Sequence, residues 1–306
     1  MHLALFLLFL RLSPGTEAQK YQDVDELFYQ ILNHSRLLSA DQEAEKTARH
    51  LLEKYPDDPY LYNLWASTEW LLIGRELNLK ADEQREIDQT EGYDQRAKRY
   101  QANTEKGLAL TEGKNDSKNL FLKATLKFDQ AKFASRYESH ISGLNHADQK
   151  AGEGIQILKQ ILAANPNFCS VYFFLGGTRL QLATKVGGLN WIFVRLFSET
   201  YTQLRSLDSD VFNEQKSIEW LEKAYQCGYP QPWLKKTWLE TTFLLAKAYR
   251  DYGKGLGTRE EMAVLQKEVP LLKQLGGMFP QNQDVASMLV ERELRLKVLQ
   301  NYFSKK

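Results

Sequence analysis

Apolar residues recur at the spacing of one face of an α-helix along almost the whole chain after residue 18. Leu27, Ile31, Leu32 and Leu38 mark one such face. Only 8 Pro and 18 Gly interrupt the 306 residues, and no segment alternates β-branched residues between turn pairs. A sandwich or barrel needs a turn signal every ~8–12 residues, so the pattern predicts an all-α fold.

Proline and glycine divide this pattern into separate helices. Proline cannot continue a helix, and glycine takes the positive φ that often ends one. Gly253, Gly255 and Gly257 follow no strand, so we interpret them as a helix C-cap and turn rather than a phosphate-binding loop. The expected helices cover residues 22–38, 41–55, 59–78, 82–111, 117–138, 148–164, 168–185, 190–206, 212–227, 233–252, 258–276 and 283–303.

The N-terminus has an unbroken apolar run from Leu3 to Leu10. A bilayer-spanning helix takes about 20 residues, so the run is too short for one and predicts a secretory signal peptide over residues 1–18, cleaved after Ala18. The alternative is a buried N-terminal helix, since no Lys or Arg precedes the run. Residues 19–306 are expected to form a single domain. The protein is therefore expected to be exported by a bacterium, to the periplasm or the medium. No Cys lies near Ala18, so no lipid anchor is expected.

Charge and composition narrow the function classes. The 40 Lys and Arg against 39 Asp and Glu argue against a nucleic-acid partner, which favours a strong basic excess. No later stretch is long and apolar enough to span a membrane. His140 and His146 lie six residues apart, a spacing that puts two side chains on different faces of a helix. Ser142 and Gly143 are expected to break the helix between them, so a metal site in a loop is the alternative, and solvated surface is favoured. No sequence pattern for a cofactor or a catalytic site is present, so the protein is expected to bind rather than to catalyse.

The two cysteines, Cys169 and Cys227, fall at the start of one expected helix and the end of a later one. In a helical hairpin these positions lie at the same end, so an exported protein has the geometry for a disulfide. Free, buried cysteines that act as small hydrophobic residues are common and are slightly favoured over this bridge.

The segment 186–207 combines two apolar patterns. Phe193, Phe197 and Tyr201 share one helical face, and Trp191 helps to make the first half apolar on nearly every side. The favoured interpretation is a helix that fills the inner surface of the fold. A partner or homodimer contact and insertion into a membrane surface are the alternatives.

Several expected hairpins repeat one order of parts: an apolar helix, a turn containing proline, and a helix that opens with aromatic residues. The chain here resembles the tetratricopeptide repeat family, whose 34-residue unit is a pair of antiparallel helices with small residues at fixed contacts. It is also reminiscent of an exported bacterial family of degenerate tetratricopeptide proteins with no assigned activity. The residues that carry the resemblance are Gly154, Leu158, Pro166, Leu175 and Gly176, with Ala44 near Pro56 and Ser217, Leu221 and Ala224 in a more divergent unit.

The resemblance implies a right-handed superhelix of roughly six hairpins, each contacting mainly its neighbours, with a concave binding face. The expected function is a non-catalytic protein–protein interaction scaffold of the bacterial envelope, with a protein or peptide partner and no cofactor. Candidate binding residues are Tyr62 and Trp65, together with the aromatic residues of segment 186–207. The alternatives are a small-molecule or lipid-binding protein with an apolar cavity near 186–207, such as a soluble component of a transport system, and an enzyme with an unmarked site.

Overall fold

The computed structural model describes residues 17–33, 38–79, 91–138, 140–186, 190–254, 256 and 258–304, and every regular element in them is helical. The all-α prediction is therefore confirmed. The α-helices are α2 (Glu17–Asn33), α3 (Leu38–Lys54), α4 (Pro59–Leu79), α5 (Glu91–Thr111), α6 (Ser117–Tyr137), α7 (His140–Ala164), α8 (Tyr172–Lys185), α9 (Asn190–Phe197), α10 (Glu199–Arg205), α11 (Glu214–Gln226), α12 (Lys235–Gly253), α13 (Thr258–Met278) and α14 (Gln283–Ser304). Short 3-10 helices, η3 (Cys169–Val171) and η4 (Pro232–Leu234), precede α8 and α12.

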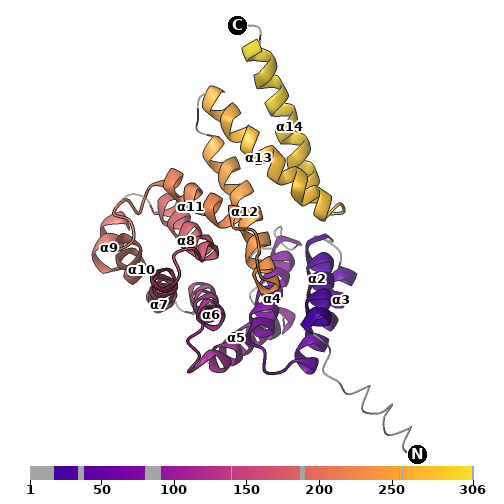
Figure 1. The fold of residues 1–306 in the computed structure, drawn as a ribbon, viewed down its shortest axis with the longest axis vertical. Coiled ribbons are helices and arrows are strands. Elements are labelled where there is room, and N and C mark those ends of the chain that lie inside the picture. The colour runs from indigo at the N-terminus through magenta and orange to yellow at the C-terminus, as the bar shows by residue number, and fades with distance from the viewer. Residues whose placement is uncertain are drawn as a thin grey trace, which may run out of the picture.

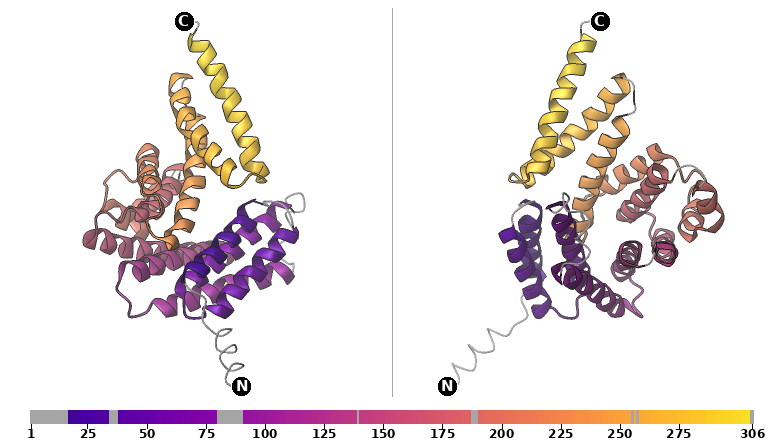
Figure 2. Two further views of the ribbon diagram at one scale, coloured as in Figure 1. Left: turned by 45° about the vertical axis from the view of Figure 1, so that its right-hand side comes forward. Right: turned by 180° about the vertical axis from the view of Figure 1, so that it is seen from behind.

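Helices close in sequence pack together as pairs: α2 with α3, α4 with α5, α6 with α7, α8 with α11, and α13 with α14. Figure 1 shows these pairs following a curved path from α2 and α3, through α4 to α7, to α8 and α11. The path then turns back, and α12 runs through the middle of the structure beside α4 (Figures 1 and 2). The predicted signal peptide lies outside the described residues up to residue 16, and Glu17 and Ala18 begin α2.

As expected, most helix contacts join elements that are close in the chain, and in addition the two ends of the described chain meet. Asn33 at the end of α2 accepts a hydrogen bond at 2.8 Å from the backbone N–H of Gln281, in the turn between α13 and α14. Lys235 at the start of α12 forms an ion pair with Asp25 of α2 at 2.7 Å. One buried apolar cluster therefore extends from Val24 to Val285, because the curved path brings the two ends of the chain together.

Several expected helix boundaries are also wrong, and the structure gives the reason for two of them. α7 begins at His140 and continues through Ser142 and Gly143, where a break was expected. Gly143 is accommodated in the helix because it packs against the end of α6: a Cβ there would lie 2.6 Å from the carbonyl oxygen of Ala134. The expected helix 190–206 is divided at Ser198, whose hydroxyl caps α10 through the backbone N–H of Tyr201.

Gly176 of α8 lies where the resemblance places a small residue, and there α8 and α11 approach closely. A Cβ on Gly176 would lie 3.1 Å from Cγ of Leu221 and 3.1 Å from the carbonyl oxygen of Ser217. The tight approach explains why a larger residue at this position would push the two helices apart.

Gly176→Val is expected to lower the free energy of unfolding by about 1–3 kcal/mol, because the added methyl groups overpack this contact. Gly277→Ala is the matched control, since Gly277 lies in α13 with nothing near its Cβ position. Replacing a helical glycine by alanine there should raise stability by roughly 0.5–1 kcal/mol. Urea unfolding followed by circular dichroism measures both, and equal effects of the two substitutions would contradict the packing argument.

The hairpin of α8 and α11 carries the two cysteines at one end. Cys169 and Cys227 form a disulfide, with their Cα atoms 6.1 Å apart. α9 and α10 form the connection at the other end of this hairpin, so the bridge closes a long loop of 58 residues.

Reduction of this bridge is expected to lower the free energy of unfolding by about 2–4 kcal/mol, chiefly because the cross-link restricts the unfolded chain. Thermal unfolding of the oxidised protein with and without dithiothreitol measures the effect. The double variant Cys169→Ser/Cys227→Ser should be insensitive to the reductant, and an equal response of both proteins would contradict a stabilising bridge.

Candidate functional site

A groove of about 710 Å³ lies between α4 and α12, and the ends of α2, α13 and α14 complete its walls. It is half-enclosed, and most of its lining surface is apolar. The lining side chains are Phe28, Ile31, Leu32, Leu64, Ser67, Thr68, Trp70, Leu71, Lys236, Leu239, Glu240, Phe243, Leu244, Ala246, Lys247, Arg250, Leu272, Leu275, Asn282 and Met288.

α12 contributes a continuous stripe to this groove. Its lining residues recur every three or four positions from Lys236 to Arg250, the spacing of one helical face. Fourteen residue steps at about 1.5 Å each make the stripe about 21 Å long. The groove is therefore elongated along α12.

A buried polar contact holds α12 against α4 and α6. The ammonium group of Lys236 donates to the side-chain oxygen of Asn63 at 3.1 Å, and the Asn63 amide donates to Asp129 at 3.0 Å. All three side chains are buried. Buried polar groups need their partners, so this chain of hydrogen bonds defines where α12 sits relative to α4.

The surrounding charges stabilise this contact. Lys132 donates to Asp129 at 2.9 Å, and Glu240 lies 3.5 Å from Lys236. Burial lowers the pKa of Lys132, but the negative charges of Asp129 and Glu240 outweigh burial and raise that pKa above its usual value. Burial, followed by the negative charge of Asp129, raises the pKa of Tyr100 well above its usual value, so the phenol stays protonated and donates to the Asp129 carbonyl.

The end of the groove beside α2 is closed by the turn between α13 and α14. The Asn282 amide donates to the carbonyl oxygen of Leu32 at 2.7 Å, and the Asn282 side-chain oxygen caps α14 through the N–H of Val285. Asn282 and Leu32 both line the groove. The first and last helices of the described chain therefore share one wall of the site.

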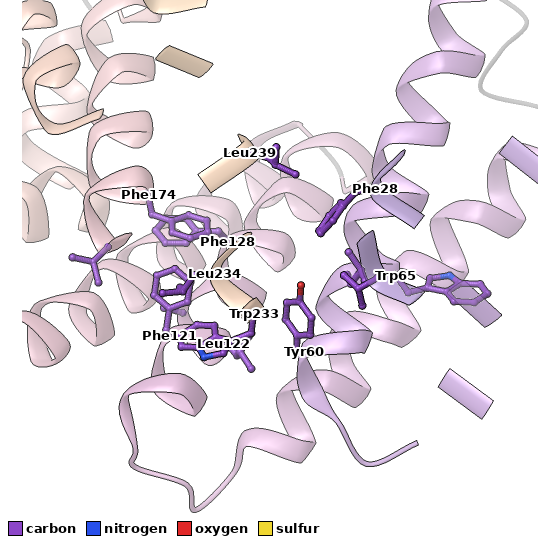
Figure 3. Packing of buried hydrophobic residues seen from close by; sticks show 14 of the residues in the cluster. Phe28, Tyr60, Trp65, Phe121, Leu122, Phe128, Phe174, Trp233, Leu234 and Leu239 are labelled. Carbon is purple, nitrogen blue, oxygen red and sulfur yellow. The ribbon is translucent and has the colours of Figure 1, made fainter. Parts of the chain in front are cut away.

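One buried hydroxyl group of the groove lining has no hydrogen-bond partner among the described residues, that of Ser67 in the α4 wall. The buried Tyr60 hydroxyl also has no partner among them, but Tyr60 is not one of the lining residues. In Figure 3 the Tyr60 hydroxyl points toward the space between Phe28 and Leu239, two residues of the groove lining. An unpaired buried hydroxyl costs free energy, and a polar group of an occupant would satisfy it.

The candidate residues predicted from sequence do not line this groove. Trp65 is buried, its indole N–H donates to Glu69 at 3.0 Å, and in Figure 3 its ring points away from Leu239. Tyr62 is half-buried and packs near Gly107 of α5. Tyr201 is buried and stacks on Phe212.

The expectation that segment 186–207 fills the inner surface is wrong for α9, because α9 has no buried residue. Trp191 is 42% exposed, Phe193 63% and Phe197 77%. α9 lies at the outer edge of the structure (Figure 1), where its connection to α10 is held by Asp148 of α7, which accepts from the Ser198 hydroxyl at 2.6 Å. Residues of α9 do not line the groove between α4 and α12.

Helical periodicity does not bring the groove residues together, because they come from helices far apart in the chain. One signal was available within α12, where cationic and apolar residues share the face from Lys236 to Arg250. That pattern predicts an amphipathic helix and does not reveal which helix lies opposite. The pairing of α12 with α4 appears only in the tertiary structure.

The described residues contain no cluster of three His, Cys, Asp or Glu side chains placed to hold a metal ion. Within the same residues, each helix is too short or too polar to cross a bilayer. Comparison with family models, with curated proteins and with solved structures finds no match to this chain.

Asp129→Ala is expected to lower the free energy of unfolding by about 1–3 kcal/mol, because it leaves the buried Asn63 amide without its acceptor. Asp57→Ala is the control: Asp57 is an exposed carboxylate in the turn before α4, and its removal should change stability by less than about 0.5 kcal/mol. Urea unfolding measures both variants, and a neutral Asp129→Ala would contradict the role given to this contact.

Proposed function

We propose that this protein is a non-catalytic binding scaffold that holds an apolar segment of a protein partner in the groove between α4 and α12. The observation that carries the proposal is the groove itself, which is mostly apolar, elongated along α12 and only half-enclosed. An open groove accepts part of a longer chain, whereas sites for small molecules bury about 70–90% of their ligand.

We propose further that the paired helices are a degenerate tetratricopeptide array, folded as a right-handed superhelix and exported to the bacterial envelope. The antiparallel pairs and the close contact of Gly176 with α11 support the repeat, since the family places small residues at such contacts. The disulfide supports export, because such bridges persist in oxidising compartments.

A small apolar ligand is the second candidate occupant. The groove volume of about 710 Å³ lies within the range of about 300–1,000 Å³ that is usual for small-molecule sites. This alternative was expected near residues 186–207, but the groove is the better location, because α9 has no buried residue.

Photo-crosslinking tests the protein-partner proposal. Leu71 lies at the lip of the groove and is 43% exposed, so p-benzoylphenylalanine at position 71 should form a covalent adduct with a defined protein during expression and export. The same residue in place of Lys106, an exposed residue of α5, is the control and should give no such adduct.

Native mass spectrometry of the unmodified protein, with denaturation of the same sample, distinguishes the two occupants. A clean mass combined with an adduct at position 71 supports the scaffold. A retained small molecule without a protein adduct would replace the scaffold by the small-ligand alternative.

A further inference from the structure

The charged residues of the groove all belong to α12, and they are unevenly distributed along it. Lys236 and Glu240 lie toward one end of the stripe, and Lys247 and Arg250 toward the other. Three cations and one carboxylate therefore line a surface that is otherwise mostly apolar. The net charge therefore differs between the two ends of the groove.

Only the first end is neutralised within the chain. Lys236 contacts Glu240 at 3.5 Å and Asn63 at 3.1 Å. Lys247 has no ion pair with any residue that the structure describes. Arg250 lies 3.4 Å from its chain neighbour Asp251 and also interacts with the buried Glu268, but Glu268 already pairs with Arg292 at 3.2 Å. The Lys247–Arg250 end of the groove is therefore positively charged.

The helix dipole favours cations near the C-terminus of α12, which accounts for part of this pattern. The dipole does not require these cations to face the groove, because side chains on the outer face interact with it equally well. Both Lys247 and Arg250 line the groove, close to Leu244 and Met288. Charges beside an apolar surface interact more strongly with a partner's charge than fully solvated charges do.

We propose that the occupant is an amphipathic helix of a protein partner whose apolar face enters the groove and whose carboxylates lie against Lys247 and Arg250. This inference rests on the proposed function. The stripe of about 21 Å matches about four helical turns. Apolar anchors at i, i+3, i+4 and i+7 are the usual way in which a helix fills such a groove.

Two fluorescein-labelled peptides of about 16 residues test the charge preference. They share leucines at positions 1, 4, 5, 8, 11, 12 and 15, about one helical face, and carry either glutamate or lysine at the other positions. Fluorescence anisotropy with the full chain should show the glutamate peptide binding at least about tenfold tighter, because the lysine peptide places like charges together. The ratio of the two dissociation constants should approach one as salt is added, because salt screens the charges.

Lys247→Glu should remove or reverse this preference. Lys247 is exposed and unpaired, so the variant should fold normally, which circular dichroism checks. Lys106→Glu is the matched control, since it makes the same change of charge on α5, away from the groove lining, and should leave the ratio unchanged. Phe243→Asp, in the groove wall, should weaken both peptides if they bind there.

The outcomes separate the two proposals. Equal binding of both peptides, weakened by Phe243→Asp, would overturn the charge selection and leave the scaffold in place. Binding of dodecanoate without either peptide would overturn the helix and favour a small amphiphile. If neither peptide nor dodecanoate binds, the inference is overturned, and the crosslinking at position 71 decides the scaffold separately.

Discussion

The chain of buried hydrogen bonds from Lys236 to Asn63 and from Asn63 to Asp129 is the interaction on which the arrangement of this protein depends. It joins α12 to α4 and α6 across 173 positions of the sequence, between Lys236 and Asn63. An ammonium group in an apolar interior is costly unless its partners are fixed. These hydrogen bonds consequently specify one position for α12, and the groove is the space that this position leaves beside α4.

The contact between the two ends of the described chain has a related effect. Asn33 and Leu32 of α2 hydrogen-bond to the turn that joins α13 to α14, so the first and last hairpins support each other. In an open repeat array each unit depends only on its neighbours. Here the ends of the path meet, and the groove has walls from both ends of the chain. Its shape should therefore respond to changes in either terminal hairpin.

The exposed aromatic side chains of α9 show that a sequence pattern does not by itself predict burial. Burial is expected for a helix that is apolar on nearly every side, because such helices are usually covered by other elements. In the structure α9 connects α8 to α10 at the outer edge, and its apolar side chains remain exposed. Periodicity identifies the apolar character of a helix but carries no information on what lies next to it. Trp65 illustrates the converse, since an aromatic residue proposed for binding is a buried part of the core.

The sequence by itself determined the all-helical fold and the approximate limits of most helices, because helical periodicity and the positions of proline and glycine act locally. It also placed Cys169 and Cys227 at one end of a hairpin, since two antiparallel helices bring the start of one beside the end of the other. Only the tertiary structure decided the return of α12 to α4, the joining of the chain ends and the exposure of α9. Those features depend on contacts such as Lys236 with Asn63, which form between segments whose separation in sequence gives no signal of their proximity.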